Sequence, residues 1–330
     1  MNQAGRDIIG DIHGQAGKLE ALLARLGYRH TQGAWRHPQG RQARFVGDLI
    51  DRGPEQLKTL TIVRDMVEAG VAKAVMGNHE YNAIAYGTEN PSRPGHHLRI
   101  RGSKNRAQHA AFLDAVGLDS PLHKTWIEWF ATLPLWLEED DMRLVHACWH
   151  TPSMAKLADL MGPGNTLTPA LIEASAHKGT EAFEAMEAIC KGLEVDLPKP
   201  VTFMDKQGIV RDRTRVRWWD ENARTYPEAA MVGPAEREQL PRVTIPEDAC
   251  MVYDRSKPVF FGHYWFTGAP DIVSDVACCL DYSAARDSEP LVAYRFDGEP
   301  LLSRDKLVAV GPQDIAELRQ RPARSARRTP

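Results

Sequence analysis

The chain has 330 residues, of which 43% are hydrophobic and 26% charged, and its formal net charge is −3. This composition excludes a disordered or fibrous protein and is typical of one large α/β domain, or of a core domain with an insertion. The weak net charge excludes attraction of a nucleic-acid duplex or anionic lipid by the overall field, so local groups must recognise any phosphate.

The chain carries no recognisable membrane or export signal. No apolar run approaches the length of a membrane span, and residues 1–11 lack the hydrophobic core of a signal peptide. We therefore expect a cytoplasmic protein with no membrane partner. The five cysteines lack C-x-x-C spacing, which predicts reduced, mostly buried thiols rather than disulfides or a thiolate zinc site.

Three times in the first 82 residues, a short apolar strand leads into a polar loop. The predicted strands cover residues 6–9, 43–46 and 71–76, and the loops read GDIHG, GDLIDRGP and GNHE. Helices are predicted after the first two loops, over residues 15–27 and 55–69. Because open α/β sheets gather ligands at the carboxyl ends of their strands, we expect the three loops to lie close together.

The next segment is predicted to be mainly helical. Residues 85–103 are rich in Gly, Pro, Arg and His and predict a mobile loop. Helices are expected over residues 104–116 and 121–133, the second capped by Ser120. Residues 134–148 then predict a hairpin whose second strand leads to His146.

The remaining chain follows a different pattern. Residues 151–257 are predicted to form an insertion or lid, with a helix near 169–191 and extended segments around 201–219. The run KPVFFGHYW predicts a buried strand ending at His263, and residues 276–308 predict antiparallel strands joined by an Asp297-Gly298 turn. We expect one domain over residues 1–310 and a flexible basic tail over residues 311–330.

Polar side chains follow each of five predicted strands. Taken alone, each has a local explanation: residues 43–54, for example, also fit an acidic N-cap before a helix from Pro54. Taken together, buried carboxylates and imidazoles that converge without a cation would be costly. The mixed oxygen and nitrogen set suits Mn²⁺, Fe or Zn²⁺. The candidates are Asp11, His13, Asp48, Asp51, Arg52, Asn78, His79, His146 and His263.

The motifs GDIHG, GDLIDRG and GNHE, with a later VHA and GH, resemble those of the calcineurin-like metallophosphoesterases. The chain most resembles the phosphoprotein phosphatase branch, which includes protein serine/threonine phosphatases and bacterial diadenosine tetraphosphate hydrolases. The resemblance covers residues 1–82 and 134–148 well, 258–298 loosely and 150–257 hardly at all. It implies a four-layer α/β fold, a central β-sandwich flanked by helices, with a partly helical insertion.

The resemblance also implies a role for each candidate residue. Two divalent metals are expected, with manganese favoured and iron or zinc as alternatives, and a hydroxide made from a shared water attacks phosphorus. His79 is the implied general acid, Asp51 orients it, and Arg52 binds phosphate. The implied ligands are Asp11 and His13 for the first metal, Asn78, His146 and His263 for the second, and Asp48 as the bridge.

The family uses a second phosphate-binding arginine from its divergent region. The run RDRTRVRWWD offers Arg211, Arg213, Arg215 and Arg217, and we favour Arg217 because it directly precedes Trp218 and Trp219. An alternating strand with its basic face in water explains the same run nearly as well. The two tryptophans and Trp265 could stack on a nucleotide base, although aromatic residues more often belong to the core.

We expect a serine/threonine protein phosphatase that acts on a phosphorylated protein. One alternative is a dinucleoside polyphosphate hydrolase with a nucleotide substrate, but GHYW departs from the Gly-His-Thr-Pro of the nucleotide-cleaving relatives. A further alternative is a non-catalytic module that binds metal or a phosphorylated ligand. The His79 and Asp51 pair argues against that module, because binding phosphate requires no proton donor.

Overall fold

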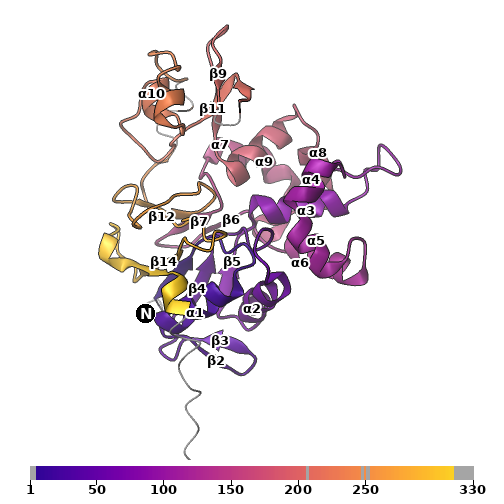
Figure 1. Ribbon diagram of the computed structural model, residues 1–330, viewed down its shortest axis with the longest axis vertical. Coiled ribbons are helices and arrows are strands. Elements are labelled where there is room, and N and C mark those ends of the chain that lie inside the picture. Colours follow the sequence, from indigo (N-terminus) through magenta and orange to yellow (C-terminus); the bar gives the residue numbers. More distant parts are fainter. Residues whose placement is uncertain (1–4, 206–207, 247–248, 250–252, 316–330) are drawn as a thin grey trace, which may run out of the picture.

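The computed structural model describes residues 5–205, 208–246, 249 and 253–315. Two β-sheets lie at its centre, with helices around them (Figure 1). In the first sheet β1, β4 and β5 are parallel, whereas β14 and β15 are antiparallel to their neighbours. The strands run in the order β15 (Leu307–Val310), β14 (Leu291–Phe296), β1 (Arg6–Ile9), β4 (Gln42–Phe45) and β5 (Ala72–Ala74).

The second sheet has four strands and is also mixed. Its order is β13 (Ala277–Cys279), β12 (Val259–Phe261), β7 (Arg143–Val145) and β6 (Trp136–Glu138). The predicted 134–148 hairpin is confirmed as the antiparallel pair β6 and β7. The prediction for residues 276–308 is only half right: β14 and β15 are antiparallel, but β13 pairs in parallel with β12. Strand β13 completes the second sheet, a pairing that no local pattern indicates.

The two sheets pack face to face through a buried apolar layer. Phe260 of β12 reaches across to β14, where its ring lies 5.1 Å from that of Tyr294 and 5.5 Å from that of Phe296, measured between centroids. Ile8 of β1 and Leu144 of β7 belong to the same buried cluster. Because successive strand residues point to opposite faces, the neighbouring residues face the outer, helical layers. The predicted four-layer α/β fold is confirmed.

Helices α1 (Ala16–Leu26) and α2 (Gln56–Glu68) follow the first two loops as predicted. Gly27 ends α1 in a left-handed conformation, with φ 100°. The structure adds an unpredicted hairpin between them, β2 (Arg29–Thr31) and β3 (Ala34–Arg36). Its Gln32-Gly33 turn has φ of 52° and 78°, the positive values that a tight hairpin turn requires.

The helical segment differs in detail from the prediction. Helix α3 (Asn78–Gly87) begins inside the GNHE motif, so the predicted loop starts later than residue 85. The predicted helix over 104–116 is two helices, α4 (Ser103–Gln108) and α5 (Ala110–Val116), which meet at His109. Helix α6 (Pro121–Ala131) is confirmed, and Ser120 accepts the N–H of His123 at its start.

Residues 151–257 divide between two hydrophobic clusters. Helices α7 (Thr151–Leu157), α8 (Pro169–Ala176) and α9 (Glu181–Lys191) pack into the main core, and α8 and α9 replace the single helix predicted near 169–191. The following chain has a small core of its own around Val216 and Tyr226 and lies at the top of Figure 1. Its elements are β8 (Glu194–Asp196), β9 (Phe203–Met204), β10 (Val210–Arg211), β11 (Arg213–Arg215), α10 (Tyr226–Ala229) and α11 (Pro234–Arg237).

Other predictions are tested only in part. The four described cysteines, Cys148, Cys190, Cys278 and Cys279, are free and buried as expected, whereas Cys250 lies outside the described residues. Most of the predicted tail, residues 316–330, also lies outside them. Among the described helices, none combines the length and apolar character that crossing a membrane requires. The roles of residues 151–257 as a lid and of 311–330 as a tail stay predictions.

Phe260 tests the packing of the sandwich. Phe260→Ala removes the ring that joins the two sheets, and we expect it to lower the free energy of unfolding by about 3–5 kcal/mol. Leu301→Ala, at a side chain that is 59% exposed, is the control and should change stability by less than about 0.5 kcal/mol. Urea unfolding measures both variants. Equal small losses would show that the two sheets do not depend on this contact.

Candidate metal centre and phosphate site

The loops after five strands meet at one edge of the sandwich. Asp11 and His13 follow β1, Asp48 follows β4, Asn78 and His79 open α3 just after β5, His146 follows β7, and His263 follows β12. Three of these residues have a positive φ, at 48° for His13, 49° for Asp48 and 75° for His263. Such backbone costs energy at a non-glycine residue and is concentrated at functional sites. The structure thus gathers the side chains of all the predicted metal ligands at this edge of the sandwich.

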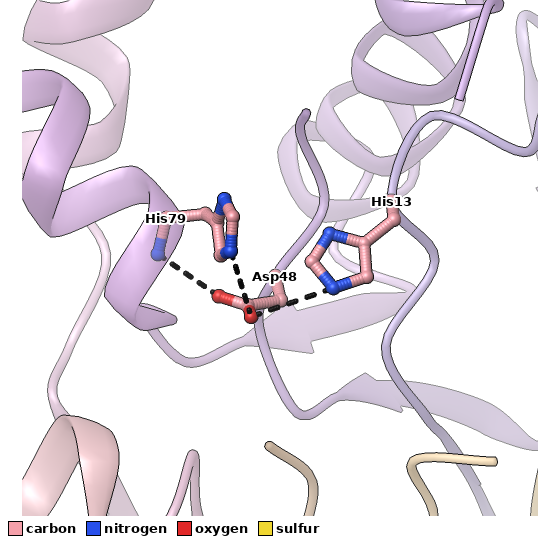
Figure 2. A group of neighbouring side chains, drawn as sticks. All are labelled: His13, Asp48 and His79. Carbon is pink, nitrogen blue, oxygen red and sulfur yellow. Dashed lines mark hydrogen bonds and ion pairs between the residues drawn. The ribbon is translucent and has the colours of Figure 1, made fainter. Parts of the chain in front are cut away.

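Asp48 lies at the centre of the group (Figure 2). Its Oδ1 accepts the backbone N–H of His79 at 3.0 Å and lies 3.3 Å from His146 Nε2. Its Oδ2 lies 3.6 Å from His13 Nε2 and 3.9 Å from His79 Nε2. Burial raises the pKa of Asp48, but the three histidines outweigh it and hold that pKa well below its usual range. The carboxylate is therefore ionised and faces histidines on both sides.

Asp11 and His13 present unsatisfied atoms to this centre. Asp11 Oδ1 and His13 Nε2 are buried and have no hydrogen-bond partner among the described residues. The other atoms are occupied: Asp11 Oδ2 accepts the N–H of His263 at 3.0 Å, and His13 Nδ1 lies 2.8 Å from the carbonyl oxygen of Ile50. A Cβ on Gly262 would lie 1.8 Å from Asp11 Oδ1, so the chain keeps a glycine beside this oxygen.

The protonation of these two groups suits metal binding. Burial lowers the pKa of His13 to about 3, so its imidazole is neutral. Since Nδ1 faces the Ile50 carbonyl and donates its hydrogen there, Nε2 carries the lone pair that a metal needs. Burial, followed by the Asp281 and Asp48 carboxylates, raises the pKa of Asp11 well above its usual range. A dication beside Asp11 would offset that repulsion.

Asn78, His146 and His263 form the other side of the group. Asn78 Oδ1 lies 3.1 Å from His146 Nε2 and 2.8 Å from His263 Nδ1. His146 Nδ1 faces the carbonyl oxygen of Val46 at 2.8 Å, which leaves its Nε2 directed at Asn78 and Asp48. Burial, and then Arg215, lower the pKa of His263 well below its usual range, so this imidazole is also neutral.

Among the residues that the structure describes, two sets of side chains have the spacing of a metal site, namely His13, Asp48 and His79, and Asp48, His146 and His263. Asp48 belongs to both sets, which is the arrangement that a bridging carboxylate requires. The donor atoms are imidazole nitrogens and carboxylate or amide oxygens, the ligands of Mn²⁺, Fe and Zn²⁺. The residues present therefore fit two divalent metals.

Asp51 joins two histidines beside the centre. Its Oδ2 lies 2.5 Å from His79 Nδ1, and its Oδ1 lies 2.7 Å from His109 Nδ1. Burial lowers the pKa of His79, but Asp48 and Asp51 outweigh burial and raise it above its usual value. Sequence reasoning missed His109, because it lies inside a predicted helix, 58 positions from Asp51, with no motif around it.

Arg52 lies on the ring of Trp265. The guanidinium carbon is 3.7 Å from the ring centroid, a cation–π contact that orients the arginine without neutralising it. The N–H of Trp265 is accepted by Asp281 Oδ2 at 2.8 Å, and Asp281 Oδ1 accepts the N–H of Ser283 at 2.9 Å. Burial raises the pKa of Asp281 to about 6. No motif pointed to Asp281, which shapes the loop that carries His263 and Trp265.

Glu80 of the GNHE motif is buried and supports the loop that carries Asp48. Its carboxylate accepts the backbone N–H groups of Asp48, Leu49, Ile50 and Gly77 at 2.8–3.2 Å. Burial and the charge of Asp48 raise its pKa to about 7. Sequence reasoning gave Glu80 no role, although its place in the motif was the available signal.

The structure does not bring Arg217 to this group of residues. Its Nη2 donates to the Glu228 carbonyl oxygen and lies 3.6 Å from Asp220, and the side chain lines a cavity bounded by β9, β11 and α11. Arg215, two residues earlier, is the arginine whose charge acts on His263. Trp218 and Trp219 are buried against Phe261, so they belong to the core rather than to a base-stacking surface.

Curated relatives of this chain are named bis(5'-nucleosyl)-tetraphosphatases. It is 33% identical to the asymmetrical bis(5'-nucleosyl)-tetraphosphatase PrpE of Oceanobacillus iheyensis over 43% of this chain and 54% of the relative. The protein of that name from Halalkalibacterium halodurans is 48% identical over 73 residues, 22% of this chain and 30% of the relative. The one from Bacillus subtilis is 32% identical over 43% of this chain and 56% of the relative. The matched part of this chain thus covers 30 to 56% of the length of these relatives.

Solved structures that this chain matches include phosphatases. A cold-active protein-tyrosine phosphatase of Shewanella sp. has a TM-score of 0.48 at 15% identity, covering 93% of this chain and 80% of the other. A protein serine/threonine phosphatase from Saccharomyces cerevisiae has a TM-score of 0.43 at 13% identity, covering 94% and 80%. The sequence model of calcineurin-like phosphoesterases matches residues 7–197, more than half of the chain. The chain therefore belongs to the calcineurin-like phosphoesterase family, metal-dependent hydrolases of phosphate ester or phosphoanhydride bonds.

Proposed function

We propose that this protein hydrolyses nucleotide polyphosphates of the dinucleoside tetraphosphate class at a centre of two divalent metals. The observation that carries the proposal is a cavity of about 370 Å³ lined by Arg52 and His79. This volume is in the range of small-molecule sites, which is about 300–1,000 Å³. Its lining includes three cationic side chains, Arg52, Arg99 and Lys191, which match the charge of a polyphosphate chain.

The proposal replaces the expected serine/threonine protein phosphatase. The curated relatives are named for cleavage of a dinucleoside tetraphosphate, which favours the nucleotide alternative over the protein substrate. The sequence GHYW differs from the Gly-His-Thr-Pro of the nucleotide-cleaving relatives, which argues against a nucleotide substrate. In the structure the Trp265 of that segment lies on Arg52, beside the same cavity, so the departure does not remove the phosphate-binding group.

The proposed metal ligands follow from the contacts around Asp48. Asp11, His13 and Asp48 would hold one metal, and Asp48, Asn78, His146 and His263 the other, with manganese expected at both. Two such cations supply a water of lowered pKa and neutralise phosphate oxygens as charge develops. Neutral His13 and ionised Asp48 are already in the protonation states that ligands need.

The chain's own side chains act on the phosphate and the leaving group. Arg52 presents a guanidinium fork for two phosphate oxygens, held by the ring of Trp265. His79 donates a proton from Nε2 to the departing oxygen, while its Nδ1 hydrogen is held by Asp51. The contact between Nδ1 and the Asp51 carboxylate favours the protonated imidazole that this step requires.

A substrate panel tests the proposal. The manganese-loaded protein is assayed with diadenosine tetraphosphate, a phosphothreonine peptide and AMP. We expect kcat/KM for the tetraphosphate to exceed that for the peptide by a factor of about 100 or more, or about 2.7 kcal/mol, because only the tetraphosphate fills the cationic cavity. A preference for the peptide would restore the protein phosphatase hypothesis.

Asp48→Asn tests the bridging role. A neutral amide cannot balance two dications, so metal content and turnover should fall together. Metal analysis of the purified variant and hydrolysis of p-nitrophenyl phosphate measure the two effects, and the circular dichroism spectrum checks folding. Full occupancy of both metals with a near-normal rate would be inconsistent with Asp48 as the bridge.

His79→Asn separates proton donation from metal binding. General acid catalysis contributes roughly 10²–10⁴-fold, and mainly for a basic leaving group. The loss in kcat should therefore be large for an alkyl phosphate and much smaller for p-nitrophenyl phosphate, with metal content unchanged. His96→Asn, at an exposed histidine of the loop between α3 and α4, is the control. Equal losses on both substrates, with chemistry rate-limiting, would remove His79 from the acid role.

A further inference from the structure

The loop between α3 and α4 supplies one of the cations that line the cavity beside His79. This loop, residues 88–102, carries Arg99, whose side chain is half-buried. Sequence analysis predicted only a mobile loop here. The structure instead holds Arg99 against α3, because its backbone N–H donates to the Ala85 carbonyl oxygen at 2.9 Å and Leu98 N–H donates to that of Thr88 at 3.0 Å.

The side chain of Arg99 is oriented by neutral groups. Its Nη1 donates to Asn82 Oδ1 at 2.9 Å and its Nη2 to Gln108 Oε1 at 3.2 Å. Asn82 lies one turn of α3 beyond His79, so the arginine is fixed to the helix that carries the proposed acid. Amide oxygens orient a guanidinium but leave its charge uncompensated.

Arg99 has no carboxylate within ion-pair distance in the part of the chain that the structure describes. Arg101, two residues later, is paired instead, since its two Nη atoms donate to the carboxylate of Asp119 at 2.7 and 2.6 Å. Burial lowers the pKa of Arg99, which reflects the cost of holding this charge away from water, although the more distant charges of Glu187 and Asp51 act in the opposite direction. The backbone bonds already attach the loop to α3, so packing alone gives no reason for an unpaired cation there.

We propose that Arg99 binds the phosphate next to the scissile one, on the leaving-group side, and so selects substrates with consecutive phosphates. This inference rests on the proposed function, which places the scissile phosphate at Arg52. His79, the proposed proton donor to the leaving oxygen, lines the same cavity, which puts that cavity on the leaving-group side. A phosphomonoester has no second phosphate for Arg99, whereas a tetraphosphate does.

Arg99→Met tests the subsite, because it removes the charge and keeps much of the length. The probes are methylenediphosphonate, with two linked phosphonates, and methylphosphonate, with one, as competitive inhibitors of p-nitrophenyl phosphate hydrolysis at fixed free Mn²⁺. We expect the inhibition constant of the diphosphonate to rise at least tenfold more than that of the monophosphonate. Arg99→Lys should fall between, since it keeps the charge but loses the fork. Arg106→Met, at an exposed arginine of α4 outside the cavity, removes an equal charge and should shift neither constant.

The same variants with diadenosine tetraphosphate separate this inference from the proposed function. If wild-type protein cleaves the tetraphosphate and Arg99→Met loses no more kcat/KM on it than on p-nitrophenyl phosphate, the subsite is refuted and the proposed function stands. If wild-type protein fails to cleave the tetraphosphate but Arg99 still distinguishes the two phosphonates, the nucleotide substrate is refuted and the subsite stands. Equal inhibition constants for both phosphonates in the wild-type protein would also overturn the inference.

Discussion

One buried carboxylate organises the site. Asp48 lies where loops from both sheets meet, and its two oxygens face His13 and His79 on one side and His146 on the other. Such a charge would be expensive in a protein interior without compensation. Glu80 holds the backbone around it, and Gly77 and Gly262 leave room beside it and beside Asp11. The sandwich can therefore be understood as the scaffold that fixes this carboxylate.

Around that centre, the chain separates metal chemistry from substrate chemistry. Most of the proposed metal ligands directly follow strands of the sandwich, which holds them rigidly, and Asn78 opens α3. The cavity beyond them is lined largely by side chains of α3, α4 and their connecting loop, which belong to the helical layer. Asp51 follows β4 and connects the two parts, because it holds both His79 of α3 and His109 between α4 and α5. A family of hydrolases can keep one centre and vary this helical wall to select among phosphate compounds.

The arginines of the cavity differ from those that stabilise the fold in how their charge is paired. Arg52 rests on an aromatic ring and Arg99 on amide oxygens, so both are oriented by groups that leave their positive charge available. Arginines that stabilise the fold are paired instead, as Arg6 is with Asp141 and Arg101 with Asp119. The difference between a paired and an unpaired guanidinium thus separates structural arginines from those that suit an anionic ligand.

The sequence alone determined the ends of the strands and the chemistry placed there, because short apolar runs followed by GDIHG, GDLIDRG and GNHE are local patterns. It predicted that Asp11, Asp48, Asn78 and the histidines would meet, and they do. It could not identify His109, Asp281 or Arg99. The roles of His109 and Asp281 depend on partners distant in the sequence, and that of Arg99 depends on its having no carboxylate partner among the described residues. Arg217 shows the converse, because its neighbours in the sequence suggested a phosphate site, whereas its side chain contacts Glu228 and Asp220 and lines a different cavity. Tertiary packing decided these points because burial and ion pairing depend on which chain segments lie side by side.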